Sequence, residues 1–405
     1  MKKKIVILTS YFCSWNGGVD LINYFLSAIS KMDDEKNFQI YVIIPKNNPK
    51  SFLKRIFYPF FQILRSIIKF KIQKNFFWKI HKGANDIENY ILNYLNTSKI
   101  KLKIIYKDFV DEHKIIKKIS PDLIMPVVIN NQNYVNSVGY VFDFQHEYLP
   151  EFFSTGEIEF RRNQIKQTLN SSRILVNSIN TKNDIIKFYK NIDKNKINVV
   201  PFSPYLHEKI LDEIIKNKFS KITNNNYFLI SNQFWKHKNH TLAIKAFRDY
   251  LEEGGKNDLV ITGEYKDHRF PKYINEIKQL ISKLNLDKKI ILTGNIDKIR
   301  QLNYLKNSQA LIQPTSFEGG PGGGAVTDAI ALNVPIILSD IIINKEIIYD
   351  KLFYFKSESQ ADLKKKLIEY DDKNIVLKES DQINKENYNR IKICSLFFKE
   401  FFNKS

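Results

Sequence analysis

The sequence predicts an α/β protein made of two doubly wound, parallel-sheet domains that face one another across a cleft. Short apolar runs of strand length alternate with segments of helical character along most of the chain. A length of 405 residues is sufficient for two domains, each with its own core. A polar stretch rich in Lys and Asn, residues 205–226, separates the two series, so we expect it to link domains 1–204 and 227–384.

The composition is that of a globular protein with an anionic partner. Hydrophobic residues make up 43% of the chain and charged residues 26%. The formal net charge of +20 would attract nucleic acid, an acidic membrane surface or a phosphorylated substrate. The sequence has neither zinc-finger spacing nor an RNA-recognition signature. Cys13 and Cys394 lie far apart, so neither a disulfide framework nor a zinc site is indicated, and a reducing compartment is compatible.

The first domain opens with a strand–helix–strand pattern. Lys2–Ser10 has the cationic and apolar parts of a signal peptide but no small-residue cleavage site, so a buried strand is the better interpretation. Gly17 and Gly18 then form a turn that starts a helix over Val19–Met32, and Phe38–Ile44 is the second strand.

Residues 51–82 form a basic amphipathic segment. Between Lys36 and Asn85 there are eleven Lys or Arg residues and no acid, and apolar residues recur at helical spacing. Such a segment can lie in an anionic membrane interface, with Trp78 as an anchor. The alternative is a helix that packs on the core and has a solvated basic face; length, aromatic content and the absence of acids favour the membrane. Charges interrupt the segment too often for it to span a bilayer.

Polar residues follow the middle strands of the first domain. Leu102–Tyr106 and Leu123–Val128 are predicted strands, and a further strand from Val138 ends at Asp143, Gln145 and His146. Functional residues of open α/β sheets gather where strands end. A lone His is more often structural, but this His has polar neighbours. The remaining predicted strands of this domain are Arg173–Ser178, which a helix from Thr181 follows, and Ile197–Pro201.

The second domain repeats the alternation and places a cationic loop after its first strand. Tyr227–Ser231 precedes Lys236, His237 and Lys238, which stand just before a helix that starts at Thr241. Cations before a helix N-terminus suit an anion. His237 and His240 have no further metal ligand nearby, so we do not expect a metal site.

Two further strands of this domain end in the same way. Leu259–Gly263 and Ile290–Gly294 both finish in Thr-Gly and are followed by Glu264 and Asn295. These polar residues would lie at the carboxyl edge of the sheet, where a nucleotide binds in such folds.

The stretch Ser308–Asp340 reads as strand, glycine loop, helix and strand. The strand Ala310–Ile312 is followed by Glu318 and a loop with Gly319, Gly320, Gly322, Gly323 and Gly324. A helix over Ala325–Leu332 ends at Asn333, a suitable left-handed cap, and Pro335–Leu338 is the next strand.

The chemistry of this stretch suits a nucleotide-sugar. Glycines let backbone N–H groups approach a phosphate at a helix N-terminus. The loop is not a Walker A motif, because Ala325-Val326 follows Gly324 where that motif has Lys-Ser/Thr. Glu318 and Asp328 would accept hydrogen bonds from hydroxyls of the sugar and the ribose. The plainer interpretation is a glycine turn between two hydrogen-bonded acids.

The stretch resembles the C-terminal signature of family 4 glycosyltransferases, which have the GT-B fold. Glu318 matches the first acid of that signature, and Asp-Ala-Ile-Ala-Leu matches the family's Glu-Ala-Met-Ala. The second acid is Asp328 rather than Glu, and it lies two positions further along than usual. Asp-Phe-Gln-His at 143–146 and Leu-Pro-Glu-Phe-Phe-Ser at 149–154 match one form of the family, although many relatives have His where this chain has Phe142.

The resemblance implies roles for further residues. Lys238 falls on the family's Lys that holds the donor diphosphate, but Gln233 replaces its Arg, and Lys236 or His237 would have to compensate. Gly17 and Gly18 match the N-terminal loop near the reacting phosphates. The implied catalytic residues are Glu318, Lys238, Asp143 and His146. The implied donor site comprises Gln233, Lys238, Gly263, Glu264, Gly294, Asn295, Gly322, Gly323, Gly324 and Asp328. His146 would act in catalysis or line the acceptor cleft.

The resemblance also implies the reaction. We expect transfer of a hexose-type sugar from a nucleotide-diphosphate sugar to a glycan or lipid-linked acceptor, with retention, in cell-surface polysaccharide synthesis. No metal or other cofactor is expected, in keeping with the absence of an Asp-x-Asp motif. The protein would be cytoplasmic and peripheral on the inner face of the membrane, with residues 385–405 as a helical tail that crosses back to the first domain. The alternatives are another nucleotide-sugar enzyme such as an epimerase, or a basic nucleic-acid-binding protein.

Overall fold

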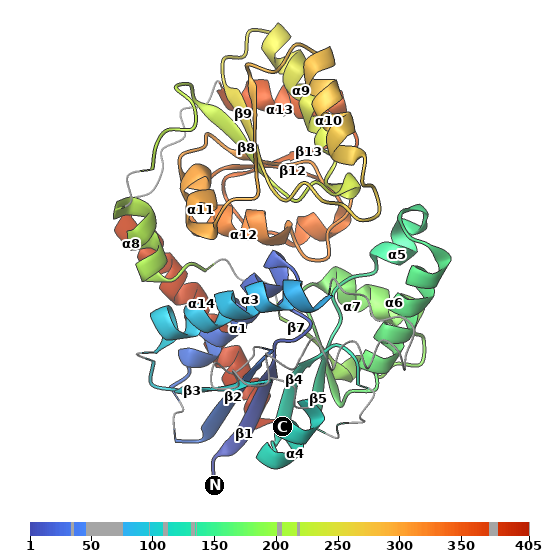
Figure 1. Cartoon of the computed structure of the whole chain (residues 1–405), viewed down its shortest axis with the longest axis vertical. Helices are drawn as coiled ribbons and strands as arrows, with labels where there is room; N and C mark the ends of the chain where they lie inside the picture. The colour runs from blue at the N-terminus through green and yellow to red at the C-terminus, as the bar shows by residue number, and fades with distance from the viewer. Residues whose placement is uncertain are drawn as a thin grey trace, which may run out of the picture.

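The computed structural model contains two parallel-sheet α/β domains, one above the other in Figure 1, as the sequence predicts. It describes residues 1–33, 36–45, 76–96, 98–107, 112–130, 134, 136–200, 205–216, 219–371 and 380–404. The membrane-facing segment predicted at 51–82 lies outside the described residues, except that residues 76–82 are helical.

The first domain is a seven-stranded sheet in the order β3-β2-β1-β4-β5-β6-β7, with every neighbouring pair parallel. Its strands are β1 (Lys3–Leu8), β2 (Phe38–Ile44), β3 (Leu102–Tyr106), β4 (Leu123–Val127), β5 (Ser137–Tyr140), β6 (Arg173–Val176) and β7 (Ile197–Val199). Its longer helices are α1 (Asn16–Ser30), α3 (Phe76–Tyr90), α4 (Glu112–Ile119), α6 (Thr155–Thr168) and α7 (Ile179–Phe188), and the short α5 (Gln145–Tyr148) follows β5.

The start of α1 differs slightly from the sequence prediction. The helix begins at Asn16, so Gly17 and Gly18 lie in its first turn rather than before it. A Cβ atom at Gly18 would lie 2.5 Å from the carbonyl oxygen of Phe12, so only glycine allows this close approach of helix and loop.

The second domain is a six-stranded parallel sheet in the order β10-β9-β8-β11-β12-β13. Its strands are β8 (Tyr227–Ser231), β9 (Asp258–Thr262), β10 (Ile290–Gly294), β11 (Leu311–Gln313), β12 (Ile336–Ser339) and β13 (Leu352–Phe355). Its helices are α8 (Glu208–Lys216), α9 (His240–Glu252), α10 (Tyr273–Lys283), α11 (Lys298–Lys306), α12 (Gly323–Ala331) and α13 (Gln360–Asp371), with a short turn of helix, η4, over Lys236–Lys238 and another, η5, over Ile342–Glu346. The edge strand β13 is absent from the sequence prediction.

The last helix, α14 (Ser380–Asn403), joins the two domains. Its buried residues Phe398 and Phe402 pack against Phe25 and Phe38 of the first domain. Near its start, the Asn387 side chain donates to the Ala331 carbonyl oxygen of the second domain over 3.0 Å. Figure 1 shows α14 running from α8 down along the first domain. None of the helices that the structure describes is long and apolar enough to cross a membrane.

Candidate active site between the two domains

The candidate site lies at the carboxyl edge of the second sheet. Because all its strands are parallel, the loops after β8, β9, β10 and β11 leave the same edge, and these loops carry the predicted donor-site residues. The edge faces the first domain, where helix α1 approaches α12. The topology therefore brings together loops that are separated by up to about a hundred residues of sequence.

An ion pair between Lys238 and Glu318 occupies the centre of this edge. Lys238 Nζ donates to Glu318 Oε1 over 2.7 Å, and the two side chains are only 12% and 6% exposed. Lys238 ends η4, and the loop after β11 is tied to it because the Ser316 N–H donates to the His237 carbonyl oxygen over 2.9 Å. This backbone hydrogen bond therefore holds the loops that carry Lys238 and Glu318, both predicted from the sequence, close together.

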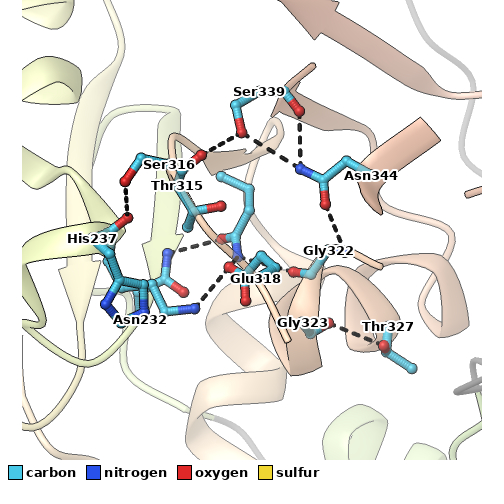
Figure 2. A network of polar contacts seen from close by, with 12 residues as sticks. Asn232, His237, Thr315, Ser316, Glu318, Gly322, Gly323, Thr327, Ser339 and Asn344 are labelled. Carbon is cyan, nitrogen blue, oxygen red and sulfur yellow. Dashed lines mark hydrogen bonds and ion pairs between the residues drawn. The ribbon is translucent and has the colours of Figure 1, made fainter. Parts of the chain in front are cut away.

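Gln313 supports this pair, and sequence reasoning missed it. The buried Gln313 amide donates to Glu318 Oε1 and to the Gly322 carbonyl oxygen, both over 2.9 Å. Its own oxygen accepts a hydrogen bond from Asn232 Nδ2 over 2.8 Å. Figure 2 shows this network around Glu318. The only signal in the sequence was a Gln at the end of an otherwise apolar strand.

The glycine loop is held in a left-handed turn at the N-terminus of α12. Gly322 and Gly323 have φ angles of 68° and 70°, which other residues rarely adopt. The Gly322 N–H donates to Asn344 Oδ1 over 2.9 Å, and the Asn344 amide donates to the Ser339 carbonyl oxygen over 2.9 Å (Figure 2). Helix α12 begins at Gly323, two residues earlier than predicted, and Asn333 beyond its end is left-handed as predicted. The N-cap residue Gly322 has no side chain to cap α12, and the Gly323 N–H donates to the Gly320 carbonyl oxygen over 3.2 Å. The first-turn N–H groups from Gly324 onward can therefore bind an anion.

Asp328 takes part in an ionic cluster that spans both domains. Lys298 Nζ donates to Asp328 Oδ2 over 2.7 Å and to Asp20 Oδ2 of α1 over 3.1 Å, and Gln301 donates to Asp328 Oδ2 over 3.3 Å. Burial raises the pKa of Asp328, although Lys298 opposes this. The other carboxylate oxygen of Asp328 accepts no hydrogen bond from the part of the chain that the structure describes. Lys298 and Asp20 were not foreseen, because they meet Asp328 only in the tertiary structure.

The first domain brings Asp143 to the glycine loop and encloses His146. A Cβ atom at Gly319 would lie 3.1 Å from the Cβ of Asp143, so the loop touches this residue directly. His146 is 1% exposed, and burial lowers the pKa of its imidazole. It lines a small cavity of about 30 Å³ together with Asp143. Asp143 thus joins the site, whereas His146 lies behind it in the first domain.

The predicted donor-site residues after β9 and β10 shape the backbone at this edge. Gly263 has a φ of 148°, and a Cβ atom there would lie 1.9 Å from the Asn232 carbonyl oxygen. Gly294 has a φ of 70° and lies against the ring of Tyr265. The Glu264 carbonyl oxygen accepts from the Phe234 N–H over 3.0 Å, and Asn295 is exposed. These residues shape the edge beside the Lys238–Glu318 pair.

Of the two residues expected to compensate for Gln233, Lys236 is exposed and His237 is buried. The Lys236 ammonium lies over the rings of Phe152 and Phe270, 5.6 and 4.6 Å from their centres. His237 is buried, and burial and then Lys238 lower its pKa well below the usual value, so it carries no charge at neutral pH. Gln233 itself is half-buried beside Asn232. No group of His, Cys, Asp and Glu side chains suited to a metal ion occurs among the described residues.

Comparison with known proteins shows that the sequence is similar to glycosyltransferases. Residues 212–390 match the family model for glycosyl transferases group 1. The chain is 24% identical over 299 residues to the O-antigen chain mannosyltransferase RfbU of Salmonella typhimurium, which covers 73% of this chain and 78% of that protein. It is 28% identical over 138 residues to protein CapJ of Staphylococcus aureus, covering 34% and 33% of the two chains.

Among solved structures, Anabaena Alr3699/HepE in complex with UDP superposes with a TM-score of 0.61 at 13% identity, and the superposition covers 100% of both chains. Such a low identity shows the fold alone. The glycine loop, the Lys238–Glu318 pair and Asp328 all lie within the region that matches the family model. The second domain is therefore similar to the glycosyl transferases group 1 family, and the chain has the GT-B fold of glycosyltransferases.

Proposed function

We propose that the protein transfers a hexose from a nucleotide-diphosphate sugar to a glycan or lipid-linked acceptor, with retention of configuration and without a metal ion, in the synthesis of a cell-surface polysaccharide. The observation that carries this proposal is the buried Lys238–Glu318 pair beside the N-terminus of α12. It places a cation, a hydroxyl acceptor and the backbone N–H groups from Gly324 onward within one edge of the sheet.

The donor would lie across this edge with its diphosphate at the N-terminus of α12. Lys238 and the N–H groups from Gly324 onward would stabilise the leaving nucleoside diphosphate, because preorganised donors act on charge that develops in the transition state. Glu318 would accept hydrogen bonds from the sugar, and Asp328 would offer its unpaired oxygen to the ribose. The UDP complex of HepE, a protein with the same fold, is consistent with a nucleotide donor.

The acceptor would approach from the first domain, where Asp143 meets the glycine loop. The relationship to RfbU, an O-antigen chain mannosyltransferase, supports a hexose and a polysaccharide product. The net charge of +20 supports a peripheral position on an anionic membrane surface of the cytoplasmic side. Replacement of Arg65, Lys69, Lys71 and Lys74 by Gln tests that position, because it should release the protein from acidic liposomes at moderate salt, whereas equal sedimentation of both forms would count against it.

The test begins with the donor. The protein is screened by thermal shift against UDP-, GDP-, ADP- and dTDP-sugars, and the nucleotide-sugar that raises Tm is then used in a transfer assay with retention read by NMR. Gly324→Ala is the diagnostic variant. Its Cβ atom would meet only Asp20 Oδ2 at 3.9 Å, so the fold should be unaffected while a diphosphate at the backbone is displaced.

Lys238→Ala should lower the rate of transfer, because it removes the cation that stabilises the leaving diphosphate. Lys245→Ala is the matched control, because Lys245 is exposed on the following helix α9. If no nucleotide-sugar is bound or consumed, the proposal is wrong. Consumption of the donor without any acceptor would indicate an epimerase instead.

A further inference from the structure

A second group of cationic side chains lies between the two domains, beside the Lys238–Glu318 pair. Arg161 comes from α6 of the first domain, and Arg269 comes from the loop after β9 of the second. Both guanidinium groups lie over the ring of Phe153, each 4.8 Å from its centre. We refer to Arg161 and Arg269 as the arginine pair. Two like charges on one ring repel each other, so a bound anion would stabilise this arrangement.

The hydrogen-bonding capacity of Arg269 is largely unused. Its side chain is only 9% exposed, and its Nε has no hydrogen-bond partner among the described residues. Its Nη1 donates to Gln145 Oε1 over 3.2 Å, but the nearest oxygen of Asp267 lies 3.7 Å away. Charged hydrogen bonds between Arg and carboxylate are normally about 2.7–2.9 Å long. A buried cation without such a bond is costly, so an oxyanion that accepts from Arg269 would offset this cost.

The neighbouring polar side chains of the first domain, those of Arg161, Gln145 and His146, also lack strong hydrogen bonds. Arg161 Nη1 lies 3.5 Å from Asp143 Oδ1, again longer than a strong charged hydrogen bond. The Gln145 Nε2 and both ring nitrogens of His146 are buried without a hydrogen-bond partner in the described part of the chain. The arginine pair therefore has several donors with spare capacity near it, because Gln145 contacts Arg269 and His146 lines the same cavity as Arg161.

We propose that Arg161 and Arg269 bind an anionic group of the acceptor, a phosphate or a carboxylate. The planar fork of each guanidinium matches such an oxyanion more closely than it matches the carboxylates of Asp143 and Asp267, which lie 3.5 and 3.7 Å away. The proposal rests on the proposed function, since it names the class of acceptor. The anion belongs to the acceptor because Arg161 stands beside Asp143, where the first domain meets the glycine loop.

The position also predicts how the acceptor affects the domains. Arg161 and Gln145 belong to the first domain and Arg269 to the second, and Arg269 already donates to Gln145 across the interface. An anion that bridges the arginine pair has contacts with both domains, so it favours the arrangement in which they meet. An acceptor that carries this charge would then assemble the site at which its own sugar is attached.

The experiment uses calorimetric titration of the full chain saturated with the nucleoside diphosphate that it binds, so that the donor phosphate site is filled. Methyl phosphate and methyl glucuronoside are the two probes, one for a phosphate-bearing acceptor and one for a uronic acid. We expect one probe to bind, more weakly at higher salt, and Arg161→Gln and Arg269→Gln each to weaken it about tenfold or more. Arg269→Lys keeps the charge without the fork and should retain part of the affinity.

Arg248→Gln is the matched control, because Arg248 lies on α9 and pairs with Asp249 and Glu252 away from the site. Absence of binding for both probes, or equal binding by wild type and both glutamine variants, would overturn the proposal. If Arg269→Gln instead weakens the nucleoside diphosphate as much as Lys238→Ala does, Arg269 serves the donor and the proposal is wrong. Failure of the nucleotide to bind is a separate result that contradicts the proposed function, and the same titration without nucleotide then still tests the arginine pair.

Discussion

Replacing Lys238 by Met should destabilise the second domain even without substrate. The substitution keeps the length of the side chain but leaves the Glu318 carboxylate, 6% exposed, with Gln313 as its remaining donor. Breaking a buried ion pair by removing one partner costs about 3–5 kcal/mol of unfolding free energy. Because Lys238 is itself 12% exposed and Gln313 keeps its hydrogen bond, we expect the lower end, about 3 kcal/mol.

The reciprocal variant should cost less. In Glu318→Gln the amide oxygen can still accept from Lys238 and Gln313, so we expect a loss of about 1–2 kcal/mol. The double variant Lys238→Met/Glu318→Gln buries no net charge and should be more stable than Lys238→Met alone. This double-mutant cycle therefore measures the coupling between the two residues in the free protein.

Urea denaturation provides the assay and is monitored by tryptophan fluorescence in a Trp15→Phe/Trp78→Phe background in which Trp235 is the remaining tryptophan. Trp235 lies in the second domain, whereas Trp15 and Trp78 lie in the first, and far-UV circular dichroism reports both domains together. The two domains need not unfold in one step, so only the transition seen by Trp235 is compared between variants. If Lys238→Met stays within about 0.5 kcal/mol of the wild type, the pair is not a buried ion pair in solution and the reasoning fails.

Three further predictions use the same methods. Gln313→Leu leaves the Gly322 carbonyl oxygen and Asn232 without their partner, so it should lower the unfolding free energy by about 2–4 kcal/mol in urea denaturation; an unchanged midpoint would contradict the network. Gly263→Ala places a Cβ atom 1.9 Å from a backbone oxygen and should cost several kcal/mol, whereas Gly324→Ala should leave Tm unchanged; similar Tm values for both would be inconsistent with this backbone. Burial lowers the pKa of His240 to about 3, so the folded protein keeps it neutral while the unfolded chain is protonated below its usual value of about 6.5. His240 should therefore contribute a fall in stability of about 1.4 kcal/mol for each pH unit from about 6.5 down to about 3, in addition to the contributions of the other buried histidines. His240→Gln should lose this contribution alone; an equal slope in both proteins would refute the assignment.

The alternation of apolar strands and helices was enough to predict the two-domain fold. Each strand is a local apolar run, so its existence can be read from neighbouring residues, as for β1 and β8. The edge strand β13 escaped prediction because its residues Leu352–Phe355 are mostly only half-buried and the run is short. The start of α12 was placed late because glycines are poor helix formers, and their left-handed turn is set by Asn344 from another loop.

The loops that carry the donor site were also predictable, because parallel strands bring their carboxyl ends to one edge. The contacts within the site were not. Three of these contacts form only because distant segments pack together. Gln313 accepts a hydrogen bond from Asn232, Lys298 donates to Asp20, and Arg161 and Arg269 both lie over the ring of Phe153. The periodicity of apolar residues predicts which side chains of one helix or strand are buried. The residue that pairs with a buried charge depends instead on how the domains pack against each other. The sequence by itself therefore determined the fold and the glycine loop, and the tertiary structure decided which charges pair and which remain available to a ligand.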